Sequence, residues 1–236
     1  MKPLATMGCA LLLAAVAAAS FGPTAAGAAP AERGFAICLC LVVVLLLLGS
    51  PSAHADRGRL AGPAARLGWS FVGAFAALIW LTLFAGLSWP LGAAAATGVF
   101  CCLLLAGGSE ALLVAVGVRR DHARIAVALV ALLNLTAPLW LGPLATRWPH
   151  IAEATLRYGM AGYFAALLEF DVARSSWLYR QASLAGTGDS YPDPTIATLV
   201  LLAAGAAAVA IAARIRQPTA AARSTPFTPS HPVPGN

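Results

Sequence analysis

Apolar residues occur along this chain in long, nearly uncharged runs that are separated by short stretches rich in arginine. A helix needs about 20 mostly apolar residues to cross the roughly 30 Å of hydrocarbon in a bilayer. This pattern predicts an all-α, polytopic membrane protein with about six transmembrane helices. The predicted spans are residues 4–22, 34–52, 68–90, 95–117, 124–145 and 195–213.

The connections between these runs differ in character. Residues 88–98 carry no charge, which predicts a tight hairpin between the third and fourth spans. Within the long connection 146–194, residues 158–170 are apolar but too short to cross, and tyrosine and tryptophan are concentrated around them. We therefore expect a segment on the external side that partly re-enters the membrane or lies in its interface. Residues 1–216 would form the transmembrane domain, and 217–236, rich in Pro, Ser and Thr, a disordered cytoplasmic tail.

Composition strengthens the membrane assignment. Hydrophobic residues make up 60% of the 236 positions and charged residues only 10%, with a mean hydropathy of +0.80. Soluble domains carry roughly 25% charged residues. The net charge of +6 comes from arginine clusters between apolar runs, which indicates membrane orientation and excludes a nucleic-acid partner. The one lysine, Lys2, excludes a P-loop and a Schiff-base lysine, and we predict neither enzymatic activity nor a cofactor.

Basic residues favour one topology. If both ends are cytoplasmic, ten basic residues lie inside and five lie outside, as the positive-inside rule requires. The sequence thus predicts a multi-pass protein of the bacterial cytoplasmic (inner) membrane. The inside set is Lys2, Arg57, Arg59, Arg66, Arg119, Arg120, Arg124, Arg214, Arg216 and Arg223; the outside set is Arg33, Arg147, Arg157, Arg174 and Arg180.

Two segments look like export signals. The stretch "SPSAHADRG" would be cut after Ala55, but cleavage there would export Arg57, Arg59 and Arg66, so we interpret it as a cytoplasmic loop. Cleavage near Ala28 remains open, and it would leave the orientation of the other spans unchanged.

Polar residues inside the predicted spans are the candidates for function. Glu110 should be paired, protonated or turned toward a cavity; it is either a pathway or coupling residue or a packing group. Gly107, Gly108 and Ser109 beside it would let another helix approach closely. Asn134 and Thr136 either line a substrate pathway or make ordinary hydrogen bonds between helices, next to a proline kink at Pro138 and Pro143.

Cysteine and histidine do not form a metal or redox pattern. All five cysteines lie in apolar runs, where cysteine is usually a small hydrophobic residue. The four histidines fall in loops or the tail, which argues against an intramembrane protease and against a haem with two axial histidines. No metal site is predicted.

Two arginine clusters lie on the predicted cytoplasmic side. They are either orientation signals or surfaces that dock a soluble partner. The docking candidates are Arg57, Arg59, Arg66, Arg119 and Arg120.

This plan resembles the membrane subunit of a type-two ABC transporter. The segment "ADRGRLAGPAARLGWSFVGAFAAL" is similar to the cytoplasmic coupling loop of that family, and residues 116–144 are similar to its passage from the fourth span to the fifth. Residues 174–216 resemble the external loop and terminal span. The resemblance implies a permease that works as a dimer with itself or a paralogous permease and is driven by a separate ATP-binding subunit. The alternative is a non-transport accessory or assembly subunit of a larger membrane complex.

Overall fold

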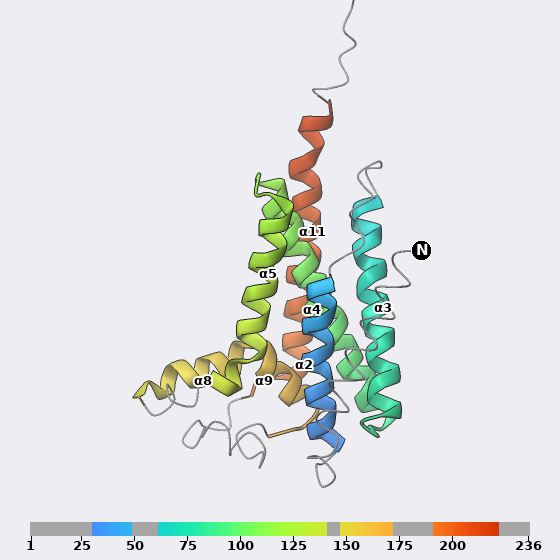
Figure 1. The fold of residues 1–236 in the computed structure, drawn as a ribbon, viewed down its shortest axis with the longest axis vertical. Helices are drawn as coiled ribbons and strands as arrows, with labels where there is room; N and C mark the ends of the chain where they lie inside the picture. The colour runs from blue at the N-terminus through green and yellow to red at the C-terminus, as the bar shows by residue number, and fades with distance from the viewer. Residues whose placement is uncertain (1–29, 49–60, 141–146, 172–190, 222–236) are drawn as a thin grey trace, which may run out of the picture.

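A computed structural model describes residues 30–48, 61–140, 147–171 and 191–221, and all regular elements in these ranges are helices. Five are long and run roughly along one axis (Figure 1). They are α2 (Pro30–Leu48), α3 (Ala61–Leu83), α4 (Trp89–Ala115), α5 (Arg120–Leu135) and α11 (Pro194–Ala221). The shorter ones are α6 (Ala137–Trp140), α8 (Pro149–Tyr158) and α9 (Met160–Leu167).

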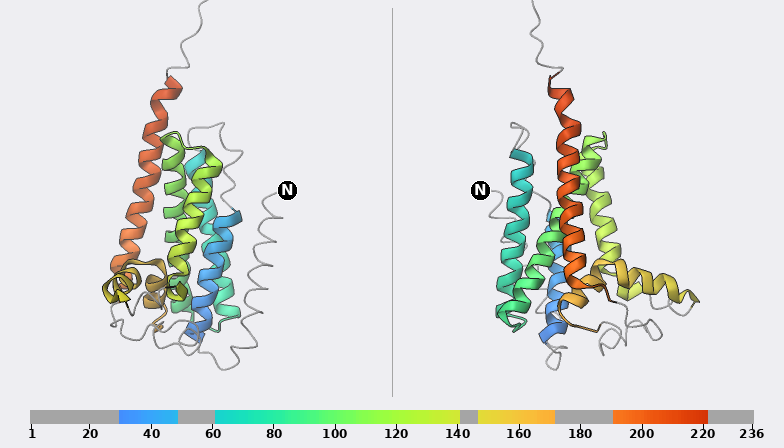
Figure 2. Two further views of the ribbon diagram at one scale, coloured as in Figure 1. Left: turned by 60° about the vertical axis from the view of Figure 1, so that its left-hand side comes forward. Right: turned by 180° about the vertical axis from the view of Figure 1, so that it is seen from behind.

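Successive long helices run in opposite directions, and α4 lies at the centre of the bundle (Figures 1 and 2). It packs against all four other long helices and against α9. We call the end where α4 finishes and α5 begins the arginine end. In the described part of the chain its charged side chains are Arg66, Arg119, Arg120, Arg124, Arg214, Glu110 and Asp121.

The opposite end carries mostly acids, and we call it the acidic end. Its described charged side chains are Glu32, Glu153, Glu169, Asp171, Asp193, Arg33, Arg147 and Arg157. Between the two ends, the described lengths of the five long helices contain no charged side chain. Charge and hydrophobicity are therefore segregated along the bundle axis, as a bilayer requires.

An uncharged tight hairpin joins α3 to α4, as the sequence predicts, but it lies at residues 84–88 rather than 88–98, and residues 89–98 belong to α4. The turn contains Gly86 at a φ of +69°, a left-handed conformation that glycine adopts without strain. Pro90 lies in the first turn of α4, where its missing N–H costs no helical hydrogen bond. The turn comes earlier than expected: α3 ends at Leu83 rather than near residue 90.

Glycine brings α4 and α11 into close contact. A Cβ atom added at Gly108 would lie 2.9 Å from the carbonyl oxygen of Gly205, and one at Gly205 would lie 3.0 Å from the backbone nitrogen of Leu105. Such separations leave no room for a side chain, so the two backbones touch through their glycines. This confirms the expected close helix approach beside Glu110.

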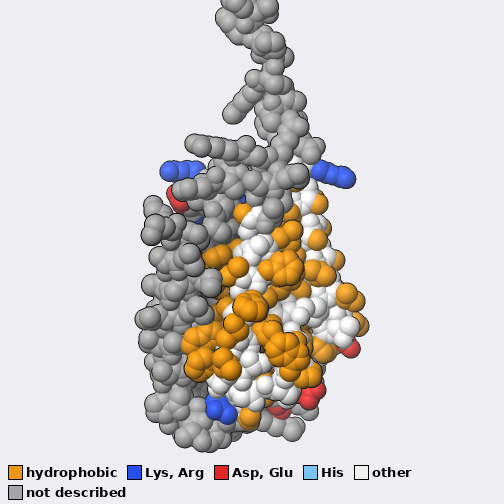
Figure 3. Space-filling model, turned by 90° about the vertical axis from the view of Figure 1, so that its right-hand side faces the viewer, with side chains coloured by type: hydrophobic (Ala, Val, Ile, Leu, Met, Phe, Trp, Pro, Cys, Tyr) orange, Lys and Arg blue, Asp and Glu red, His pale blue; other side chains and the backbone are white. Residues whose placement is uncertain are grey.

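Large apolar side chains are exposed on the outer faces of three long helices. They include Phe71 and Phe75 on α3, Ile125 and Val130 on α5, and Leu199 and Val200 on α11, all at least 60% exposed. Figure 3 shows hydrophobic side chains over the middle of one face and charged ones toward its ends. Exposed apolar surface on this scale is typical of a protein in contact with lipid.

Within the part of the chain that the structure describes, three helices are long and apolar enough to cross a membrane: Ala65–Leu83, Trp89–Ala115 and Pro194–Ile215. These apolar helices indicate a membrane protein. They correspond to the third, fourth and sixth predicted spans, while the first, residues 4–22, lies outside the described residues. The second predicted span, residues 34–52, corresponds to α2, which has 19 helical residues.

The fifth predicted span, 124–145, differs from what the structure contains. Helix α5 ends at Leu135, and Thr136 caps it before the short helix α6. Pro138 has no N–H to continue the helical ladder, which accounts for the interruption. At 1.5 Å per residue, the 16 residues of α5 reach about 24 Å.

The apolar segment near residues 158–170 does not cross the bundle. Helix α8 lies across the acidic end, and α9 packs beside it against α4 and α5 (Figure 1). The corner between them needs glycine, because a Cβ at Gly159 or Gly162 would collide with the carbonyl oxygen of Thr155 or Leu156. Helix α11 continues to Ala221, past the expected start of the tail at residue 217; residues 222–236 lie outside the described part.

Candidate functional site

Glu110 lies on α4 close to the arginine end and is only 7% exposed. Its Oε1 is 3.6 Å from Nε of Arg120, the first residue of α5. The turn between the helices reverses the chain through Gly117 at a φ of +101°, which brings the start of α5 back against the last turns of α4. Glu110 is therefore paired with a neighbouring helix rather than turned toward lipid.

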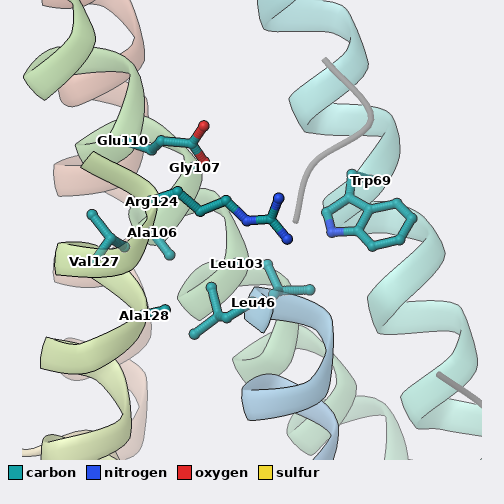
Figure 4. Close-up of a pocket in the computed structure, with 9 residues that line it drawn as sticks. All are labelled: Leu46, Trp69, Leu103, Ala106, Gly107, Glu110, Arg124, Val127 and Ala128. Atoms are coloured by element: carbon teal, nitrogen blue, oxygen red, sulfur yellow. The ribbon is translucent and has the colours of Figure 1, made fainter. Parts of the chain in front are cut away.

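A small pocket opens beside this pair. Its volume is about 30 Å³, which is room for about two water molecules. The guanidinium group of Arg124 extends from α5 across the pocket toward Trp69 of α3, with the Glu110 carboxylate nearby (Figure 4). The lining residues are Leu46, Trp69, Leu103, Ala106, Gly107, Glu110, Arg124, Val127 and Ala128.

Arg66 adds a third guanidinium group on the α3 side. It is 7% exposed, and its aliphatic carbons lie over Gly107, where an added Cβ would be 3.6 Å from Cδ of Arg66. A Cβ at that distance would make an ordinary van der Waals contact, so the arginine stem simply packs against this turn of α4. Ser70 donates a hydrogen bond from Oγ to the carbonyl oxygen of Arg66, 3.1 Å away.

The docking candidates are placed differently from one another. Arg119 is exposed at the tip of the turn between α4 and α5, where a soluble partner could reach it. Arg120 is one-third exposed and paired with Glu110. Arg66 is buried, so its side chain is not presented to a soluble partner. Arg57 and Arg59 lie outside the described residues.

Asn134 and Thr136 lie at the acidic end, far along the bundle from Glu110 (Figure 1). The side-chain oxygen of Asn134 accepts a hydrogen bond from the backbone N–H of Met160, 2.6 Å away, at the start of α9. Thr136 donates to the carbonyl oxygen of Leu132 in its own helix, at 2.7 Å. The three pathway candidates therefore do not meet in one site, and Asn134 joins two helices.

Of the polar and aromatic side chains that line the pocket, the sequence marked Glu110 as a functional candidate but neither Arg124 nor Trp69. Arg124 counted only toward membrane orientation, and Trp69 was not considered. A signal for Arg124 exists, because Arg120 and Arg124 are four positions apart and share one face of α5. Trp69 comes from another helix, and its proximity depends on how α3 packs against α4.

The site shows no metal-binding arrangement. Among the described residues, no three His, Cys, Asp or Glu side chains lie together as metal ligands would. Cys38, Cys101 and Cys102 are buried as free thiols in α2 and α4. What the arginine end does offer is a small pocket lined by the guanidinium group of Arg124 and the carboxylate of Glu110, with Arg66 packed over Gly107 and Arg120 paired with Glu110 beside it.

Comparisons with protein-family models, with curated proteins and with solved structures find no match to this chain.

Proposed function

We propose that this chain is the membrane-spanning permease subunit of a transporter that is driven by a separate ATP-binding subunit. The observation that carries the proposal is the pair of short helices ahead of α11. Helix α9 is inserted among α4, α5 and α11, with Phe164 fully buried, and α8 lies across the end of the bundle. A partly re-entrant segment before the last span is what the resemblance to type-two ABC permeases implies.

The proposed orientation has the arginine end in the cytoplasm of a bacterial cell. It is supported by the charge segregation of the described residues, since arginine collects at one end and acids at the other. In this orientation the α4–α5 turn, with exposed Arg119, faces the cytoplasm together with the connection between α2 and α3. Both would be available to an ATP-binding subunit.

Co-purification tests this proposal. The protein would be co-expressed with the ATP-binding subunit encoded next to it and purified in detergent. We expect a stable complex, and we expect the triple charge reversal Arg57→Glu, Arg59→Glu and Arg119→Glu to abolish it without preventing membrane insertion. Arg157→Glu is the matched control, because Arg157 is exposed at the opposite end.

A second candidate, an accessory subunit that packs within a larger membrane complex, is favoured by the closed interior. Within the described residues the pocket at Arg124 is small, and α4 is packed through Gly108 directly against the backbone of α11. A permease of this kind would need its path between two protomers. Recovery of a stoichiometric complex with other membrane proteins, and of no nucleotide-binding subunit, would replace the permease proposal with this one.

A further inference from the structure

Helices α8 and α9 follow one another at the acidic end but differ in how much of each is covered. Five of the eight residues of α9 are buried, whereas in α8 only Ala152 and Leu156 are. Helix α8 extends sideways from the long helices, across their axis (Figures 1 and 2). Most of its surface therefore lies outside the packed bundle.

Two stripes of opposite character run along α8. Positions that are three and seven residues apart lie on one face of a helix. The apolar stripe is Ile151, Ala154 and Tyr158, and the polar stripe is His150, Glu153 and Arg157. Ile151 is 52% exposed and Tyr158 is 81% exposed, so the bundle leaves most of the apolar stripe uncovered.

The contact between α8 and α5 fixes the level of α8 along the bundle. Asn134 of α5 accepts the hydrogen bond from the N–H of Met160, directly beyond the corner at which α8 ends. Asn134 lies 14 residues after Arg120, which is about 21 Å at 1.5 Å per residue, and a helix with its side chains is about 10 Å across. The hydrocarbon core is about 30 Å thick. With Arg120 at one membrane surface, α8 lies where the hydrocarbon ends at the other.

Aromatic and cationic side chains lie together at both ends of α8. The guanidinium carbon of Arg147 is 5.4 Å from the ring centroid of Trp148, and that of Arg157 is 5.9 Å from the ring centroid of Tyr158. Tryptophan and tyrosine prefer the membrane–water interface, and an arginine beside them can extend its charged group into the headgroup layer. Both ends of the helix therefore carry the side chains that this interface favours.

We propose that α8 lies in the lipid–water interface of the bilayer, with the apolar stripe in the lipid and the polar stripe in the water. Its partner is the phospholipid of the external leaflet in the proposed topology, beside the exposed apolar face of α5. An amphipathic helix of this kind buries its apolar face about 5–10 Å into the boundary between headgroups and acyl chains. The proposal requires neither the permease nor the accessory-subunit function.

The test compares neighbouring positions of α8 in the full-length protein. The protein is reconstituted alone into phospholipid liposomes, and a charged maleimide is supplied on both sides of the membrane. Three pairs of variants introduce one cysteine from each stripe: His150→Cys with Ile151→Cys, Glu153→Cys with Ala154→Cys, and Arg157→Cys with Tyr158→Cys.

We expect the polar-stripe cysteine of each pair to react at least about tenfold faster than its neighbour, because lipid excludes a charged reagent. The unaltered chain gives the background from the five native cysteines. Reaction in denaturant is the control, since the two members of a pair should then react alike.

A second measurement identifies what covers the apolar stripe. Ile151→Cys and His150→Cys are labelled in detergent with an uncharged bimane dye and reconstituted with phospholipid that is brominated in its acyl chains. After subtraction of the signal from the labelled unaltered chain, we expect the dye in Ile151→Cys to be quenched and the dye in His150→Cys to remain bright.

Equal reaction rates within all three pairs would overturn the proposal, because α8 would then lie wholly in water or wholly in lipid. An Ile151→Cys variant that is protected from the charged reagent but not quenched by brominated lipid would overturn it too. Protein, such as a second copy of this chain, would then cover the apolar stripe in place of lipid.

Discussion

At the acidic end of the bundle, the hydrogen bonds that join α5, α9 and α11 come from uncharged groups, although Tyr191 also donates to the carboxylate of Asp171 just outside these helices. Asn134 of α5 accepts from the backbone of α9, and the hydroxyls of Tyr163 and Thr198, 2.7 Å apart, join α9 to α11. Phe164 of α9 is fully buried, with its ring against Gly98 of α4 and 5.5 Å from the ring of Tyr163.

At the arginine end, charges join the helices instead. Glu110 and Arg120 are 3.6 Å apart, with Arg66 and Arg124 close by. Short hydrogen bonds between neutral groups require one distance and angle between the helices that they join. Ion pairs act over longer distances and respond to salt and to charged ligands. We therefore expect the packing at the acidic end to change little with salt or with charged ligands. The arginine end is the part whose helix contacts such ligands can alter.

The largest expected difference between the two ends is their side of the membrane. A reporter fused after residue 60 or residue 121 should be cytoplasmic, and one near residue 187 external, because the arginine end then lies inside. The measurement is the activity of reporters that function on one side only. An external signal at residue 121 would invert the proposed orientation.

Removal of the Phe164 side chain should destabilise the helix packing at the acidic end. Phe164→Ala leaves a cavity among α4, α5 and α9 and should lower the free energy of unfolding by about 3–5 kcal/mol. Unfolding in detergent by a denaturing surfactant measures this. Phe75→Ala is the control: Phe75 is 66% exposed, and its loss should change stability little.

Loss of the ion pair should have a smaller effect. Glu110→Gln leaves Arg120 without its anionic partner and should cost about 1–2 kcal/mol, a value held down because Arg120 is one-third exposed and partly hydrated. A double-mutant cycle with Arg120→Gln isolates the coupling between the two residues. Additive effects in that cycle would show that the pair contributes nothing.

The hydrogen bond between α5 and α9 should contribute slightly less. Asn134→Ala leaves the N–H of Met160 without its acceptor and should cost about 1 kcal/mol. Thr136→Val serves as control, since the Thr136 hydroxyl bonds only within its own helix turn. Equal losses in the two variants would remove Asn134 as a link between helices.

The smallest expected difference between the two ends is in how the cost of a mutation depends on salt. An increase in ionic strength from about 0.01 M to 1 M shortens the Debye length from about 30 Å to 3 Å. The cost of Glu110→Gln should then fall by a few tenths of a kcal/mol, whereas the cost of Asn134→Ala should stay constant. If both costs responded alike, the contrast between the ends would not be electrostatic.

Periodic sequence information accounts for the long helices but not for how they meet. Apolar runs predicted α3, α4 and α11 because hydrophobicity along the chain decides membrane crossing. Pro138 predicted a kink in the fifth span but not that α5 would end at Leu135, because a proline inside an apolar run is tolerated in many membrane helices. The polar character of Glu110 marked one member of the arginine-end cluster. Its contact with Arg120 depends on a turn at Gly117, and the approach of Trp69 depends on helix packing.

The shortness of α5 has a consequence for the surrounding lipid. In the proposed topology α5 crosses beside α4, but it reaches about 24 Å, whereas the 27 residues of α4 reach about 40 Å. Lipid next to the exposed leucines and isoleucine of α5 must match the shorter length, so the bilayer should thin locally on that side. Such hydrophobic mismatch makes a protein sensitive to membrane thickness, and the chain should prefer thinner bilayers to thicker ones.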